Sequence, residues 1–174
     1  MKTPFLNPEH YTGKRFHLPW VWDVNSWGSL PEALVRNAEE VVGWIMTDEY
    51  QSLRWGYGVV AITPRRYCAM GWSMKLPGWN GDFDAECLGY LLRYMETLAV
   101  FESATSHPWF KKALAWLAGF VDADGLCRIP RESLMGKGNW ILGRLGAAEL
   151  SPRTYRKRVL EATARLMLVE NKLT

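Results

Sequence analysis

Four stretches of the chain carry apolar residues at spacings of three and four, the period of an α-helix with a buried face. They lie at about residues 29–46, 82–101, 106–121 and 151–169. The apolar positions in the four stretches are, in order, Leu34, Ala38, Val41, Val42 and Ile45; Cys87, Leu88, Leu91, Leu92, Met95, Leu98 and Ala99; Phe110, Ala113, Leu114, Leu117 and Val121; and Tyr155, Val159, Ala162, Leu166 and Val169. At 174 residues the chain is long enough to bury these faces in one core. The pattern predicts one all-α domain over 1–174.

Local signals place the helix starts and indicate how the helices pair. Ser29 and Ser151 can cap the first and last helices, and each is followed within two residues by proline. The segment 82–101 has a second apolar face, with Tyr90, Tyr94 and Phe101, so it should lie between neighbours. Only a few residues separate it from the next helix, which predicts an antiparallel helix hairpin with the last helix packed across it.

Two segments have no helical period. Residues 1–28 are rich in aromatic residues, and Pro19 would remove a backbone donor from a helix interior, so we expect an extended aromatic arm. Residues 56–81 alternate Gly and Pro with aromatic residues and predict a long loop, with short strands or helical turns around 59–62 and 67–72. A loop of this length is often functional.

Composition excludes several classes of protein. Hydrophobic residues make up 48% and charged residues 22%, which is ordinary for a globular chain, whereas ten tryptophans are unusual. No apolar run reaches the length of a membrane helix, and the polar N-terminus does not resemble a secretory signal. The three cysteines, Cys68, Cys87 and Cys127, form no C-x-x-C pair, which favours reduced thiols in a cytoplasmic protein. A dispersed net charge of +3 argues against nucleic acid as a partner, although four basic residues crowd the start of the last helix, namely Arg153, Arg156, Lys157 and Arg158.

Two motifs resemble parts of the terpenoid-cyclase and protein-prenyltransferase α/α toroid. One is W-L-A-G-F-V-D-A-D-G-L-C-R-I-P over residues 116–130, in which a helix ends in a D-G turn followed by an apolar residue. The other is M-G-W-S-M-K-L-P-G-W over residues 70–79, which is similar to uncharacterised bacterial relatives of that toroid. The resemblance covers about 70–169 and implies antiparallel helix hairpins in a partial toroid. The catalytic motifs of the family are absent: glycine follows Asp124 where the D-x-D-D motif of the cyclases ends in acids, and the prenyltransferases' D-x-C zinc motif does not occur.

Asp122 and Asp124 are the candidate catalytic pair. Within the toroid resemblance they stand nearest to the cyclase acids, whose role there is to protonate an alkene. Oxygen ligands on alternate residues can also start a calcium loop, but the later ligands of such a loop are not in register here. A turn or capping role is the competing interpretation, and the sequence implies neither a metal ion nor a cofactor.

Aromatic residues in the two irregular segments predict a ligand site. The expected ligand-binding residues are His17, Trp22 and Asp23 in the arm and Trp72 and Trp79 in the loop. Irregular segments held on a helical scaffold are where sites often lie, and His17 with Asp23 could form an imidazole–carboxylate pair.

Three functions therefore remain open. The leading hypothesis is an aromatic cleft for an apolar or amphipathic ligand or a partner protein. The second is an enzyme of isoprenoid-type chemistry, in which tryptophan faces stabilise carbocations. The third is a homo-oligomer that associates through a helix with two apolar faces, with 86–101 as the candidate helix.

Overall fold

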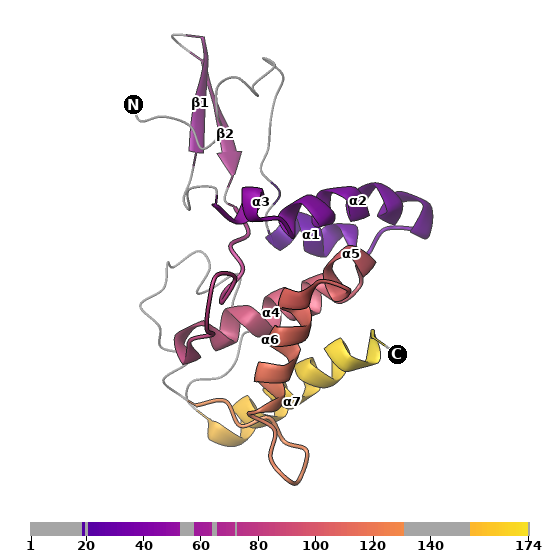
Figure 1. Ribbon diagram of the computed structural model, residues 1–174, viewed down its shortest axis with the longest axis vertical. Helices are drawn as coiled ribbons and strands as arrows, with labels where there is room; N and C mark the ends of the chain where they lie inside the picture. The colour runs from indigo at the N-terminus through magenta and orange to yellow at the C-terminus, as the bar shows by residue number, and fades with distance from the viewer. Residues whose placement is uncertain are drawn as a thin grey trace. The chain divides into compact units, whose positions relative to one another are not determined.

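The computed structural model describes residues 19, 21–52, 58–63, 66–71, 73–130 and 154–173. This part of the protein is mainly helical, which confirms the predicted class (Figure 1). The helices are α1 (Val21–Trp27), α2 (Glu32–Ile45), α3 (Asp48–Ser52), α4 (Leu88–Leu98), α5 (Glu102–Thr105), α6 (Pro108–Ala118) and α7 (Tyr155–Asn171), with a 3₁₀ turn at Ala85–Cys87. Two strands, β1 (Gly58–Thr63) and β2 (Arg66–Gly71), complete the described elements. None of the described helices is long and apolar enough to cross a membrane.

Contacts divide the chain into two compact units, whereas the sequence predicts one helical domain over 1–174. Unit 1 is Met1–Lys75 and unit 2 is Leu76–Thr174. The hydrogen-bond partners change from unit 1 to unit 2 at this boundary. The Lys75 ammonium donates back to the carbonyl oxygen of Gln51, whereas the Pro77 carbonyl accepts from the indole of Trp109. The boundary depends on bonds between residues far apart in sequence, which periodicity does not reveal.

In unit 1, α1 corrects the prediction of an extended arm over 1–28. Val21 and Val24 are buried three residues apart, and α1 packs against α2. Pro19 lies before the helix, where its missing N–H removes no intrahelical hydrogen bond. A short helix of this kind is stabilised by its packing rather than by propensity. Residues 1–18 and Trp20 lie outside the described residues.

The end of α2 and helix α3 are held together by buried polar groups. Ala38, Val42 and Ile45 of α2 are buried, as predicted. The hydroxyl of Tyr50 donates to the Pro19 carbonyl (2.6 Å) and accepts from the backbone N–H of Met74 (2.7 Å). Burial raises the pKa of this phenol above its usual range, so the hydroxyl keeps the proton that it donates to the Pro19 carbonyl.

The predicted loop at 56–81 contains an antiparallel hairpin. β1 and β2 pair with each other, with Val60 opposite Cys68 and Ala61 opposite Tyr67. The strands lie at the two places where the sequence allowed short strands. β-branched and aromatic residues in these runs favour a pleated backbone. The rest of the loop after residue 72 runs without regular structure to the 3₁₀ turn before α4.

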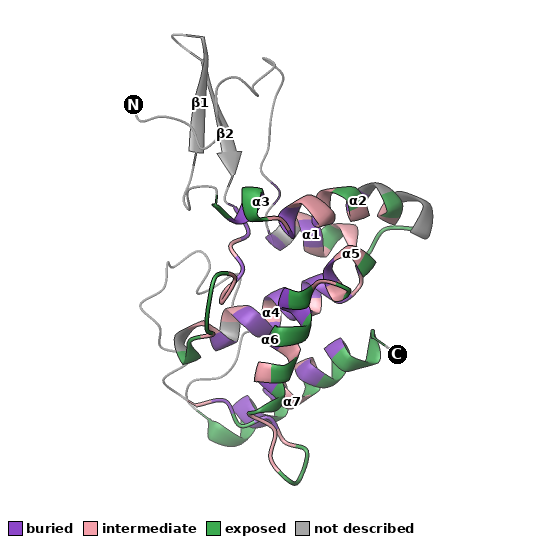
Figure 2. Cartoon of the chain, viewed as in Figure 1, coloured by how far each residue is buried: buried purple, intermediate pink, exposed green. Residues whose placement is uncertain are grey.

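Unit 2 is built around α4, against which both α6 and α7 pack (Figure 1). Its buried residues include Leu88, Leu91, Leu92, Tyr94, Met95 and Leu98 on α4; Phe110, Ala113 and Leu117 on α6; and Val159, Ala162, Leu166 and Val169 on α7. These positions confirm most of the apolar stripes expected of the three helices and the two-sided burial of α4. Tyr155, the first residue of the stripe expected on α7, is instead exposed. Figure 2 shows the same pattern, with α7 buried on one side and exposed on the other.

Candidate functional site

A row of aromatic side chains covers one side of α6. We call it the aromatic row, and it consists of Trp79, Phe83, His107, Trp109, Trp116 and Phe120. Trp79 and Phe83 come from the segment that precedes α4, and the other four belong to α6 or its ends. Trp109 and Trp116 are seven residues apart, which places them on one side of a helix. Two segments of unit 2 therefore contribute rings to one surface.

Specific contacts hold the segment that carries Trp79 and Phe83 against α6. The Trp109 indole N–H donates to the Pro77 carbonyl (2.8 Å), and the Lys112 ammonium donates to the Gly81 carbonyl (2.5 Å). Gly78 has φ +65°, and a Cβ atom there would lie 2.5 Å from the Phe83 ring. Only glycine allows both this backbone conformation and this close approach.

The rings form a continuous series of contacts. Trp79 stacks on His107 with centroids 5.0 Å apart and planes at 11°. The ring centroids of Phe83 and Trp116 are 5.2 Å apart. Trp116 packs edge to face against Phe120, with centroids 4.9 Å apart. Trp109 joins the two halves, with centroids 6.4 Å from Trp79 and 6.5 Å from Phe83. Offset and edge-to-face contacts of this kind fix ring orientation.

The row is partly open to solvent and carries one cation. Trp109 is buried, whereas the other five rings are partly exposed. The Lys112 ammonium lies 5.6 Å from the centroid of Phe83, within range of a cation–π interaction. His107 caps α6, because its Nδ1 accepts from the backbone N–H of Trp109 (3.2 Å). The surface offers flat apolar faces beside a positive charge.

The candidate catalytic pair lies in the turn after α6. The Asp122 carboxylate accepts from the backbone N–H groups of Asp124 and Leu126, both at 2.9 Å, and pairs with Arg128. Gly125, with φ +77°, completes the turn. The backbone N–H of Leu126 and the Arg128 guanidinium hold the pKa of Asp122 below its usual range. These contacts are those of a carboxylate that holds a turn together, and the assignment of Asp122 as a catalytic residue stays a prediction.

Asp124 differs from Asp122 because its side chain is 80% exposed and reaches Arg128 only at 4.0 Å. Its assignment as a catalytic residue stays a prediction. Within the described part of the chain, no three His, Cys, Asp or Glu side chains gather as metal ligands would. Cys127 is fully buried, and burial raises the pKa of its thiol to about 11, so it is not an activated nucleophile.

Of the predicted ligand-binding residues, Trp79 lies in the aromatic row. Asp23 is partly buried in α1 of unit 1, and Trp22 lies in the same helix with a side chain outside the description. His17 and Trp72 lie outside the described residues. The cleft between arm and loop therefore stays a prediction.

Sequence reasoning missed the other members of the row as ligand-binding residues. A detectable signal was present, since Trp109, Trp116 and Phe120 recur at helical spacing beside the buried stripe of α6. The structure also changes the interpretation of the basic residues at the start of α7. Arg158 is buried, and its Nε donates to the Ile129 carbonyl (3.0 Å), so it is not part of an exposed basic cluster.

Comparisons of the chain with protein-family models, curated proteins and solved structures find no match. The fold and the site define it as a mainly helical protein with an exposed aromatic row. The resemblance to the α/α toroid stays a prediction.

Proposed function

We propose that unit 2 is a binding module that holds an amphipathic anion on the aromatic row. The continuous series of partly exposed rings beside Lys112 carries this proposal. An aliphatic or planar apolar body would lie over the ring faces, and its anionic group would meet the ammonium of Lys112. This is the ligand class of the leading hypothesis from the sequence, and Trp79 is the one residue that the two proposals share.

The chemistry of the row supports a ligand rather than a role in the core alone. Five of the six rings keep solvent-exposed area, so a ligand can reach them without the protein opening. A surface without an enclosing wall removes only one side of a ligand from water. We therefore expect weak binding, with Kd roughly between micromolar and millimolar.

Laurate is the probe that tests the proposal, titrated below its micelle concentration and followed by isothermal calorimetry. Trp116→Ala removes a ring face. Lys112→Gln removes the cation together with its hydrogen bond to the Gly81 carbonyl, so Lys112→Arg, which keeps the charge, is measured beside it and should bind laurate. Trp116→Ala and Lys112→Gln should each weaken laurate binding by about tenfold, which corresponds to about 1.4 kcal/mol. Lys111→Gln is the matched control, because Lys111 is an exposed neighbour on α6 that belongs to none of the ring contacts.

Two results would overturn the proposal. One is laurate binding that is equal in the wild type, Trp116→Ala and Lys112→Gln. The other is tight binding of a single-stranded oligonucleotide that depends on Trp116 and exceeds laurate binding, since bases also stack on aromatic faces. Circular dichroism of each variant must match the wild type for either comparison to count.

A further inference from the structure

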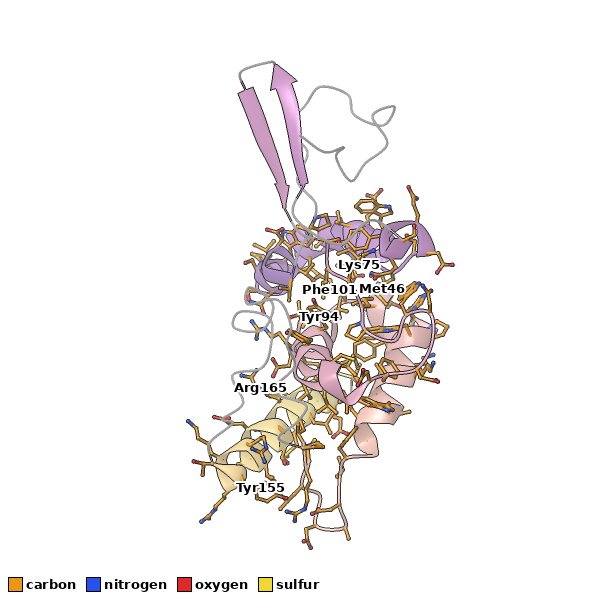
Figure 3. All side chains as sticks on the ribbon, turned by 90° about the vertical axis from the view of Figure 1, so that its left-hand side faces the viewer. Met46, Lys75, Tyr94, Phe101, Tyr155 and Arg165 are labelled. Atoms are coloured by element: carbon orange, nitrogen blue, oxygen red, sulfur yellow. The ribbon has the colours of Figure 1, made fainter. Side chains whose placement is uncertain are left out.

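α7 is apolar on two opposite sides. Its inner side packs against α4 through Val159, Ala162, Leu166 and Val169. The Arg165 guanidinium fixes this side with hydrogen bonds of 2.9 and 2.8 Å to the two carboxylate oxygens of Glu96 (Figure 3). Further hydrogen bonds join α7 to the rest of unit 2, including the bond from the Cys127 N–H to the Thr163 hydroxyl and the bond from Arg158 to the Ile129 carbonyl.

The outer side of α7 bears a second apolar stripe that they do not explain. Leu160, Met167 and Leu168 are 53%, 62% and 55% exposed, and Ala164 is exposed between them. Spacings of four, three and one place these residues on one side of the helix, opposite the buried face. Single exposed apolar residues are common, but a stripe over two turns of one helix is typical of an interaction surface.

The charges at the two ends of α7 indicate what covers the stripe. Arg156 and Lys157 lie in the first turn of α7, and Glu170 lies in the last turn. Their charges have the same signs as the helix dipole at those ends, positive at the start and negative at the end. Lys172 beyond the end is directed to α4, where its ammonium donates to the Glu96 carbonyl. Lys157 pairs with Glu161 on the same helix, so Arg156 at the start of α7 and Glu170 at its end are the opposite charges that a partner would meet. A second α7 in antiparallel orientation matches both ends at once.

We propose that the outer face of α7 pairs antiparallel with α7 of a second copy of the chain, about a two-fold axis near Ala164. In this arrangement Leu160 lies near the partner's Leu168, and Arg156 lies near the partner's Glu170. A two-fold axis makes the surface self-complementary, so both ends of the helix pair equally. The small side chain of Ala164 lets the helix axes approach at the centre.

The size of this surface sets the expected affinity. A helix of 17 residues is about 25 Å long, and one such pair lies at the lower end of the areas that specific interfaces bury. We therefore infer a concentration-dependent dimer with Kd in roughly the micromolar range. This inference is independent of the ligand proposed for the aromatic row.

Sedimentation velocity of the full chain over a wide concentration range tests the pairing. The wild type should shift from monomer to dimer, and Leu160→Glu and Leu168→Glu should stay monomeric because each buries a carboxylate in the apolar interface. Both positions are exposed, so the variants should fold. Leu30→Glu in unit 1 is the matched control, because it makes the same change at an exposed leucine and should leave the dimer intact.

A charge-reversal set tests the orientation. Arg156→Glu or Glu170→Lys alone should weaken the dimer by about fivefold, and the double variant should restore it. The two residues are about 21 Å apart along one helix, well beyond the range of a screened interaction within one chain. Restoration therefore requires contact between copies.

The proposal is overturned if the wild type is monomeric at every concentration, which would mean that the stripe is uncovered or covered by the chain itself. It is also overturned if Leu160→Glu dimerises as the wild type does. A double variant no stronger than the single variants would exclude antiparallel pairing.

Discussion

At the scale of single residues, the Tyr50 hydroxyl should contribute strongly to stability. Its hydroxyl satisfies two buried backbone groups, the Pro19 carbonyl and the Met74 N–H. Tyr50→Phe leaves both without this partner, and an unsatisfied buried group costs about 1–3 kcal/mol. We expect the free energy of unfolding to fall by about 2–4 kcal/mol in urea denaturation.

Tyr155→Phe is the control for this measurement. The Tyr155 side chain is exposed, and its hydroxyl accepts from Arg128 at 3.1 Å (Figure 3). Water can replace that contact, so the loss should stay below about 0.5 kcal/mol. Equal losses in the two variants would contradict the role assigned to Tyr50.

At the scale of elements, the turn after α6 should make stability depend on pH. The folded-state pKa of Asp122 lies below that of the unfolded chain, so its contribution is present above the unfolded pKa and is lost as pH falls through the folded pKa. Asp122→Asn removes the ionisable group and the ion pair with Arg128. The variant should be less stable than the wild type at about pH 7, and the difference should shrink toward about pH 3.

Urea denaturation at both pH values measures this effect. Asp82→Asn is the control, since Asp82 is exposed and outside the turn. A gap between wild type and Asp122→Asn that stays constant as pH falls would show that the carboxylate's charge does not stabilise the turn. Turnover measured on the same variant, once a substrate is known, would test the catalytic assignment separately.

Elements with long, regular periods could be predicted from the sequence, and short ones could not. α2, α4, α6 and α7 each carry several apolar residues at helical spacing, and the structure has all four. α1 cannot be predicted in this way, because two buried valines are too few to establish a period and because Pro19 favours a break in the helix. The structure places that proline before the first turn, where it is tolerated.

At the scale of the whole molecule, features that depend on contacts between distant segments lay beyond the sequence. The division after Lys75 follows from which partners Lys75 and Pro77 bind. The aromatic row follows from the path of the segment that carries Trp79 and Phe83 across α6. The sequence predicts only Trp79 as a ligand-binding member of the row, because rings beside a buried helix stripe cannot be told from core residues by spacing alone.

The two proposed surfaces of unit 2 should act independently in the full chain. The aromatic row is built on α6 and the preceding segment, the outer stripe lies on α7, and the two share no residue. Leu160→Glu should therefore bind laurate with the wild-type affinity, and laurate at saturation should leave the dimer constant unchanged. Coupling between sites is reciprocal, so a laurate-induced change in dimerisation would appear as an equal factor in laurate affinity. If Leu160→Glu weakens laurate binding while Trp116→Ala does not, the anion binds on the apolar stripe of α7, and the aromatic row loses its proposed function.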